Sequence, residues 1–595
     1  MSTNASGKIV RVSRAQRFGS NQMNNSHDPR PDLINAEQRG CLVQALALEE
    51  LRTQRKELGD ILCELHNASL VNLASDQNLL AIDALAHNEF WIAVHPLNEA
   101  IPHLNCSHRE VLALVHMLVN KAGSDGAAGM PNLSLGTWSK NHPEEAGKVI
   151  DGIKGLDDLC LAHGVFVVAG IGDAALAFDL IRNTNSSVSA IGLRALGRMG
   201  IVSESDVKKG VDDAFGFVEL ETDPDVRAAA IEAAFGLWEK LGPSKPYRQR
   251  EFIETIGKKG GANELSLLSA MLFYYGQGLP KESIDQVLGM LETLPSNSGA
   301  TLRNLDHAIK KNDDRWDFKR VVAVFAALIP SLEKKADKRD YHSFTSWAMS
   351  SPQNASYLFA AWLNGGEFGL CSFLVDLLSG GPKGADVWIQ KQHLPPDGND
   401  QIFMAQKCVG FLWHHEVAAA AILLSIVKYG QLQAQSMAEK LLFNPLLLSY
   451  GGDLRDFLEK QCSNASKRIS SCAERLLSKH DAHIAGLDKA RELVELLPAI
   501  EHRRAVAIKD RDRSREIQKL AHERSIFAGL MTHHTLLYGR KSFSIIHGAE
   551  GKKHPNISPL SEISHSVELP RLMVVDPVGF NARLTFFRAM KRRSA

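Results

Sequence analysis

Hydrophobic residues recur at helical spacing along most of the chain. Between residues 37 and 75 leucines repeat at close to every third or fourth position, which is the period of one face of an α-helix. The pattern predicts two further helices at 75–95 and 108–122. The second of these follows Ser107, carries Glu110 three residues later and stops at Gly123. That arrangement is typical of a capping box and a glycine C-terminus.

Runs of β-branched residues are short and rare before residue 530. One lies at Val165–Val168, but an Ala- and Leu-rich stretch follows it, so the middle of the chain is predicted to be helical throughout. The last part differs, because segments 541–548, 565–570 and 571–580 alternate or carry β-branched residues between glycines and prolines. These segments are predicted to form strands of a small module or an irregular cap.

Two helical segments, within 185–200 and 223–242, have similar sequences. Val188 aligns with Val226, thirty-eight residues later, and an Asn or Asp stands three residues before each valine. An N-cap residue belongs at that position. Small residues at shared positions in both segments allow close helix approach. A third segment around 414–430 has similar chemistry.

These segments resemble the HEAT-like, armadillo-type helical repeat, whose second helices often read D-x-x-V-R-x-x-A followed by A-L-G. The resemblance is clearest at 185–242, and the first copy departs from it because Ser189 takes the arginine position. It implies a stack of α-hairpins, each burying its apolar face on the next. The alternative is an Ala-rich helical domain in which two helices are similar by chance. The residues that carry the resemblance are Asp223, Val226, Arg227, Ala230, Ala233 and Gly236.

We therefore predict a mainly α fold, a HEAT-like α-hairpin superhelix with a small mixed or irregular C-terminal section. The expected domains are a disordered basic tail (1–36), an N-terminal helical segment (37–125), a HEAT-like repeat region (126–480), and a charged helix with a small strand-bearing module (481–595). An organelle transit peptide is the alternative interpretation of the arginines in the tail.

Composition excludes several classes of protein. The chain has 595 residues, 44% hydrophobic and 23% charged, with 68 basic and 68 acidic side chains. This balance excludes a globally basic nucleic-acid coat. The eight cysteines are scattered without a C-x-x-C pair, as expected of thiols in a reducing compartment. The longest apolar run, Val417–Val427, is too short to cross a bilayer. We expect no membrane span and a cytoplasmic protein.

Two basic segments are candidate binding sites. Segment 501–525 holds eight basic and five acidic residues, which is typical of a solvated helix with ion pairs, or of a helix that faces nucleic acid. Segment 571–595 holds six basic residues, one acid and three phenylalanines. It either contacts nucleic acid or docks its phenylalanines on the fold. The candidate binding residues are Arg503, Arg504, Arg511, Arg583, Arg588, Arg592 and Arg593.

Motifs for enzymatic chemistry are missing from the sequence. It contains no P-loop, no G-x-G-x-x-G after a strand, no H-E-x-x-H and no G-x-S-x-G. Arg515 and His522 stand in the R-x6-H spacing, which resembles the Arg/His pair of helical HEPN-type ribonucleases, although Glu516 departs from that pattern. We expect no cofactor and no metal.

The sequence thus predicts a non-enzymatic scaffold or accessory subunit of a multi-protein bacterial system, with protein partners along a concave helical face. The alternative is a nucleic-acid-binding repeat protein, with HEPN-like ribonuclease activity through Arg515 and His522.

Overall fold

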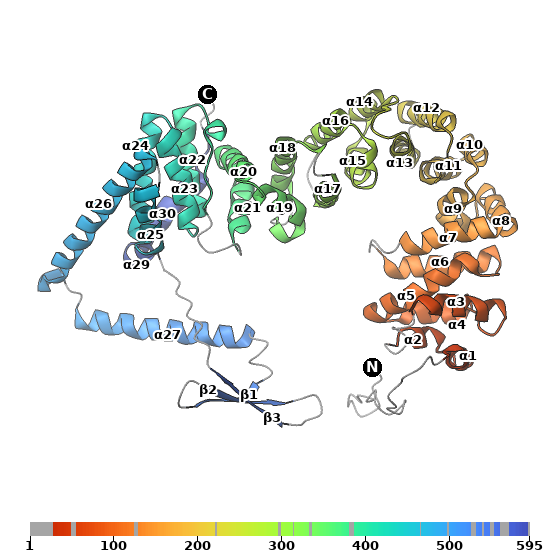
Figure 1. Ribbon diagram of the computed structural model, residues 1–595, viewed down its shortest axis with the longest axis horizontal. Helices are drawn as coiled ribbons and strands as arrows, with labels where there is room; N and C mark the ends of the chain where they lie inside the picture. Colours follow the sequence, from red (N-terminus) through yellow and green to blue (C-terminus); the bar gives the residue numbers. More distant parts are fainter. Residues whose placement is uncertain are drawn as a thin grey trace. The chain divides into compact units, whose positions relative to one another are not determined.

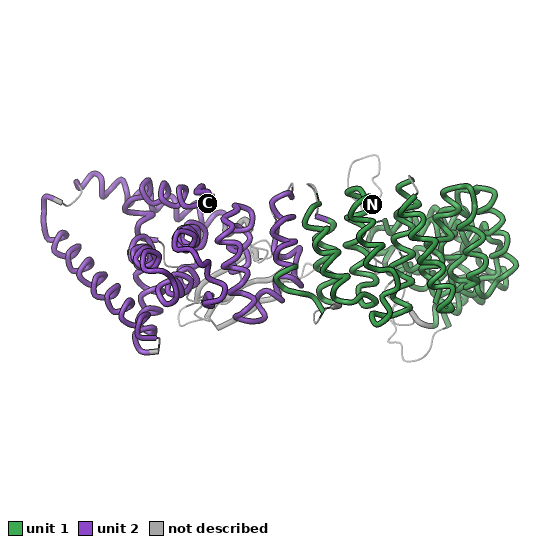
Figure 2. The backbone as a smooth tube through the Cα atoms, turned by 90° about the horizontal axis from the view of Figure 1, so that it is seen from above, with its two compact units in different colours: residues 1–295, 300–320 green, residues 296–299, 321–595 purple. Residues whose placement is uncertain are grey.

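The computed structural model shows a mainly α protein that folds as two compact units (Figures 1 and 2). Unit 1 comprises residues 1–295 and 300–320, and unit 2 comprises residues 296–299 and 321–595. The structure describes residues 28–48, 55–123, 129–200, 202–220, 223–294, 299–312, 315–332, 336–379, 386–464, 466–496, 499–524, 531–537, 541–547, 553–559 and 570–592.

Unit 1 consists of helices joined by short turns. Its helices are α1 (Arg30–Gln38), α2 (Leu42–Leu46), α3 (Arg55–Asn67), α4 (Asp76–Ala84), α5 (His87–Ala100), α6 (His108–Ala122), α7 (Gly129–Asn141), α8 (Pro143–Lys154), α9 (Asp158–Ile171), α10 (Ala174–Ile181), α11 (Ser186–Arg198), α12 (Glu204–Leu220), α13 (Pro224–Leu241), α14 (Gln249–Lys259), α15 (Ala262–Tyr275), α16 (Lys281–Leu291) and α17 (Gly299–Asn312).

Helices of unit 1 pack in two rows. The odd-numbered helices α3 to α15 form one row in which each contacts the next odd-numbered helix. In the other row α2, α4, α6 and α8 contact one another in turn, and so do α12, α14 and α16. Figure 2 shows these helices following one another along unit 1. Each row buries apolar side chains, including Trp138 and Trp238, which are fully enclosed.

Many polar contacts between neighbouring parts of the fold join residues that lie 34 to 41 positions apart. The side-chain oxygen of Asn67 accepts a hydrogen bond from the backbone N–H of Asn105 at 2.7 Å, a separation of 38 residues. The side-chain oxygen of Asn105 in turn lies 3.2 Å from Nε2 of His142, 37 residues on. In unit 2, Ser356 and His393 are 37 apart and Glu439 and Arg475 are 36 apart. The same step therefore recurs within each unit.

The two similar segments of the sequence form α11 and α13. Asn185 caps α11 and Asp223 caps α13 through side-chain oxygens that accept backbone N–H bonds, which confirms both predicted N-caps. Gly197 and Gly236 face each other across this pair of helices, because a Cβ added to Gly236 would lie 2.5 Å from the Gly197 carbonyl oxygen. The capping box of Ser107 and the C-terminal glycine of α6 are confirmed as well.

Unit 2 contains the remaining helices. They are α18 (Phe318–Leu328), which begins in unit 1, and α19 (His342–Met349), α20 (Pro352–Gly365), α21 (Phe368–Leu378), α22 (Gly398–Leu412), α23 (Glu416–Tyr429), α24 (Leu432–Leu441), α25 (Asp453–Asn464), α26 (Lys467–Arg491), α27 (Ile500–Arg524), α29 (Arg571–Val575) and α30 (Pro577–Ala589). A π-helical segment at Leu442–Leu447 follows α24.

Three antiparallel strands lie between α27 and α29. They are β1 (Met531–Leu537), β2 (Lys541–His547) and β3 (Lys553–Pro559), paired in the order β1-β2-β3. His533 pairs with Ile545, and Phe543 pairs with Ile557. The strand predicted at 541–548 is therefore present, and a small strand-bearing section lies in the C-terminal part.

Two expectations need correction. Segment 571–580 is helical, in α29 and the start of α30, because Asp576 caps α30 and Pro577 occupies its first turn. Segment 565–569 lies outside the described residues. Helix α1 begins at Arg30 and buries Leu33, so the last seven residues of the predicted tail 1–36 are helical. Among the described residues, no helix is both long enough and apolar enough to span a membrane.

Candidate functional site

The charged segment predicted to bind a partner forms α27. Every side chain from Ile500 to Leu520 is exposed, including three of the candidates, Arg503, Arg504 and Arg511. Most helical stability in proteins comes from packing of an apolar face, and residues 500–520 of α27 bury no side chain. This part of α27, with charges of both signs, therefore presents a surface to solvent or to a binding partner.

Basic side chains line one face of α27. Arg504, Arg511, Arg515 and Lys519 follow one another at steps of seven, four and four residues, which place them within one arc of the helix surface at 3.6 residues per turn. The row extends about 22 Å along the axis at 1.5 Å per residue. Acidic residues of the same helix lie beside this row, and Asp512 approaches Arg515 at 3.7 Å.

The two candidate catalytic residues both belong to α27. Arg515 is exposed and makes a long surface ion pair with Asp512, which contributes little stability. His522 lies seven residues further on in the helix, and its side chain lies outside the described residues. Their spacing places both residues on the same side of α27.

The C-terminal candidates lie on or just after α30, and three of them form hydrogen bonds or ion pairs with other residues of unit 2. Arg583 donates to Oδ1 of Asn444, Nε of Arg588 donates to the Gly410 carbonyl at 2.6 Å, and Arg592 pairs with Asp400. Arg593 lies outside the described residues. The three described arginines therefore hold the end of the chain against unit 2.

Helix α30 docks on α22 through aromatic side chains. Phe580 and Phe587 are buried, whereas Phe586 is 61% exposed. Phe587 packs against Gly410, where an added Cβ would lie 2.9 Å from the Phe587 Cβ. The docking interpretation therefore holds for two of the three phenylalanines of this segment.

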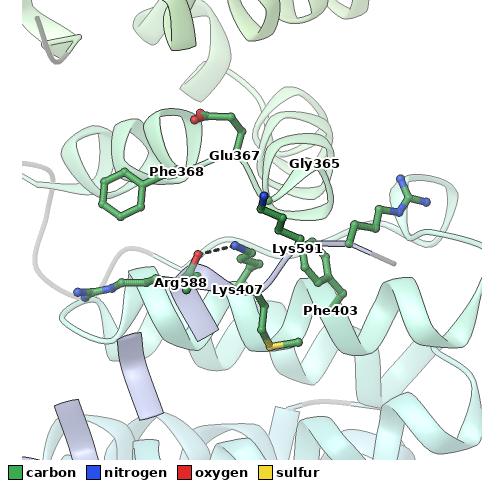
Figure 3. A pocket seen from close by; sticks show the side chains of 11 residues that line it. Gly365, Glu367, Phe368, Phe403, Lys407, Arg588 and Lys591 are labelled. Atoms are coloured by element: carbon green, nitrogen blue, oxygen red, sulfur yellow. Dashed lines mark hydrogen bonds between the residues drawn. The ribbon is translucent and has the colours of Figure 1, made fainter. Parts of the chain in front are cut away.

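A cavity of about 460 Å³ lies beside this docked end (Figure 3). The turn between α20 and α21 forms one side through Gly365 to Phe368, and α22 contributes Phe403 and Lys407. Residues 588–592 complete the lining. The volume lies within the range of small-molecule sites in proteins.

Lys407 is the most buried charged residue that lines this cavity. Its side chain is 1% exposed, and Nζ donates to the Arg588 carbonyl at 2.7 Å. The ammonium also lies 5.3 Å from the ring centre of Phe403 and 5.8 Å from that of Phe411. Burial lowers the pKa of Lys407, which Cys371 and Glu367 partly offset.

Glycine at position 366 permits this arrangement. Gly366 ends α20 with φ at +67°, and a Cβ there would lie 2.4 Å from the Phe403 ring and 3.0 Å from Cε of Lys407. The backbone of the turn therefore rests directly on the ring and on the lysine stem. Sequence reasoning missed Lys407, although its place between two phenylalanines of an apolar helix was a signal.

A pair of histidines lies between α6 and α9 in unit 1. Nδ1 of His116 is 3.2 Å from Nε2 of His163, and Nδ1 of His163 is 2.9 Å from Oδ1 of Asn132. Because the amide oxygen can only accept, Nδ1 of His163 carries the proton and Nε2 accepts from His116. Burial, with a smaller effect of His116, lowers the pKa of His163 to about 4. His163 is therefore neutral at pH 7.

Comparison with known proteins assigns no family to this chain. The chain matches no protein-family model, and no curated protein matches it.

Proposed function

We propose that this protein is a HEAT-like helical-repeat scaffold that binds another protein and carries no reaction of its own. The observation behind this proposal is the recurrent step of 36 to 38 residues between contacting positions in both units. A repeat protein has this property, because each hairpin contacts only its neighbours. The two rows of helices in unit 1 provide further support.

An exposed apolar cluster supports a protein partner. Met573, Val574, Val575 and Val578 are 42%, 73%, 70% and 79% exposed within six residues of α29 and α30. Single exposed apolar residues are common on protein surfaces, but clusters of them are typical of interaction sites. We propose that this cluster contributes to the partner-binding surface.

Affinity capture from the source cells tests this proposal. We expect a partner protein to be retained with and without nuclease treatment, and to be lost when Val574 and Val578 are both replaced by Glu. Thr585→Glu on α30 is the matched control, since Thr585 is also exposed but lies outside the cluster. Equal capture of the partner by the double variant and the wild type would show that this cluster does not contribute to the partner-binding surface.

The row of basic residues on α27 favours a second function, the binding of nucleic acid. Four cations spaced along about 22 Å of one helix face suit the phosphates of a nucleic-acid backbone, and phosphate contacts make affinity depend steeply on salt. Arg515 and His522 would also form the Arg/His pair of a HEPN-like ribonuclease.

Fluorescence anisotropy with labelled duplex DNA and RNA separates the two functions. If α27 binds phosphates, Arg511→Gln should reduce the slope of log affinity against log salt on duplex DNA by about 0.9. Arg513→Gln is the control, because Arg513 is exposed but lies on the side of α27 opposite Arg504. Absence of binding at low salt argues against this function, and intact labelled RNA after long incubation argues against the ribonuclease.

A further inference from the structure

The cavity beside α30 holds a buried lysine that makes no ion pair with a described carboxylate. An ammonium carries three N–H donors, and only one of those of Lys407 has an acceptor among the described residues, the Arg588 carbonyl. No described carboxylate forms an ion pair with it. Burial of an unpaired charge is costly, so buried charges in proteins are normally compensated.

Capping of α30 uses one donor of Lys407, and together with the rings of Phe403 and Phe411 it offsets only part of the buried charge. The Arg588 carbonyl lies in the last turn of α30, where a cation is favourable. A neutral donor would serve that hydrogen bond without the cost of burying a charge. The remaining donors and the charge call for an anion in the cavity.

A second lysine reaches the same space. Lys591 lines the cavity, and Figure 3 shows its side chain extending between Lys407 and the turn that carries Gly365 and Glu367. The Arg588 side chain extends away from Lys407 in the same view, and its Nε donates to the Gly410 carbonyl. Arg592 also lines the cavity but pairs with Asp400, so the charge offered to a ligand comes mainly from two lysines.

The cavity contains one carboxylate, which has a partner of its own. An oxygen of Glu367 accepts from the backbone N–H of Leu370 at 2.8 Å and so caps α21. Its negative charge opposes an anionic ligand, and two lysines outweigh it. A ligand that carries more than one negative charge gains most from this balance.

Aromatic rings supply an apolar side. Phe403 lines the cavity and is nearly buried, whereas Phe368 lines it and is 61% exposed. Ligand sites in proteins commonly combine aromatic lining with a few polar or charged groups, and an apolar group attached to an anion would contact these rings. A cavity of about 460 Å³ is also larger than inorganic phosphate needs.

We propose that this cavity binds a small phosphate monoester, with the phosphate at Lys407 and Lys591 and an apolar group against Phe368 and Phe403. A phosphate carries a charge of about −1.5 to −2 at pH 7, which suits two lysines better than a single carboxylate does. The site is independent of the proposed scaffold function.

Isothermal titration calorimetry on the full-length protein tests the ligand class. The probes are phenyl phosphate, inorganic phosphate, benzoate and benzyl alcohol. We expect phenyl phosphate to bind at least about tenfold more tightly than inorganic phosphate or benzoate, and benzyl alcohol not to bind. No binding of phenyl phosphate, or equal binding of benzoate or benzyl alcohol, overturns the proposal.

Variants then test the residues. Lys407→Met should weaken phenyl phosphate at least about tenfold, and Lys591→Met about threefold. Glu367→Gln should tighten binding about twofold, because it removes the opposing charge and keeps an oxygen for the α21 cap. Lys428→Met on α23 is the control and should leave binding unchanged.

Lys407→Met also removes the hydrogen bond to the Arg588 carbonyl and could release α30. Lys591→Met and Glu367→Gln test the site without that effect. Both side chains are replaced without removing the Lys407 hydrogen bond, so the two variants should shift affinity in opposite directions on an otherwise intact fold. Unchanged affinity in both, or a shift in the same direction, overturns the assignment of the site.

Discussion

Replacing Gly236 by Ala should loosen the packing of α11 on α13. The added Cβ would lie 2.5 Å from the Gly197 carbonyl oxygen and 3.2 Å from the Gly197 Cα. Ordinary contact begins at 3.4 Å, so the helices must separate by about 0.9 Å. Overpacking of this kind costs about 1–3 kcal/mol, and a backbone carbonyl cannot turn away as a side chain can.

The same substitution at Gly216 should have the opposite sign. Gly216 lies inside the neighbouring helix α12, and an added Cβ would meet no atom within 4 Å. Alanine is favoured over glycine in a helix interior by about 1 kcal/mol. Because backbone atoms meet at Gly236, the upper end of the overpacking range applies there. After subtraction of the alanine gain, Gly236→Ala should destabilise by about 2 kcal/mol, while Gly216→Ala should stabilise by about 1 kcal/mol.

Hydrogen exchange measured by mass spectrometry gives the local opening free energy in each helix. Peptides from α11 and α13 should exchange about 30-fold faster in Gly236→Ala, and peptides from α12 about fivefold slower in Gly216→Ala. Local exchange suits a stacked array better than a single melting curve does, since such arrays can unfold in parts. If Gly236→Ala leaves α11 and α13 unchanged, the close backbone contact does not contribute to stability.

Three further predictions concern buried groups. Because the pKa of His163 is lowered to about 4 in the folded protein, the unfolded state binds more protons than the folded state between pH 6.5 and 4. The free energy of unfolding should therefore fall as the pH drops through this range, by up to about 3 kcal/mol. Urea titrations at pH 7 and pH 4.5 measure this decrease in the free energy of unfolding, which should be smaller in His163→Gln than in the wild type. Phe587→Ala should release α30 at a cost of about 3–5 kcal/mol, whereas exposed Phe586→Ala should not, as limited proteolysis will show. Arg227→Met leaves buried Glu264 without its ion-pair partner at 2.7 Å and should lower the free energy of unfolding by about 3 kcal/mol. Adding Glu264→Met should restore much of this stability. A double-mutant cycle in which the second substitution restores no stability would contradict an energetic coupling between the two side chains.

Local signals in the sequence predicted local structure well. Ser107 and Glu110 form the expected capping box, and Asn185 and Asp223 cap helices as expected. Each of these features depends on residues two to four positions apart, which sequence spacing specifies directly. Small residues in the two similar segments predicted close helix approach, and Gly236 and Gly197 meet across this pair of helices.

Segment 571–580 was predicted incorrectly because its valines were weighed by β-propensity alone. Val574, Val575 and Val578 are exposed, so no sheet partner uses them. The helical signal was present further on, since Phe580, Leu584 and Phe587 are spaced at four and three residues and are buried on one face of α30. Asp576 before Pro577 was a start signal for that helix.

The cavity could not be predicted from the sequence. Lys407 meets the carbonyl of a residue 181 positions later in the chain, and no local pattern specifies that pairing. The basic C-terminal residues were recognised, but composition alone could not show that Arg588 and Arg592 contact Gly410 and Asp400.

The distance along the chain between α22 and α30 has a consequence for synthesis on the ribosome. Most helices of the array can dock on a predecessor as soon as they emerge, since their contacts reach back about 40 residues. The partner of Lys407 lies 181 positions later in the chain, so about 10–35 s pass between the synthesis of the two residues at typical elongation rates. Throughout that delay the α22 face beneath Phe587 is open, and a chaperone that covers it would protect the nascent chain from aggregation.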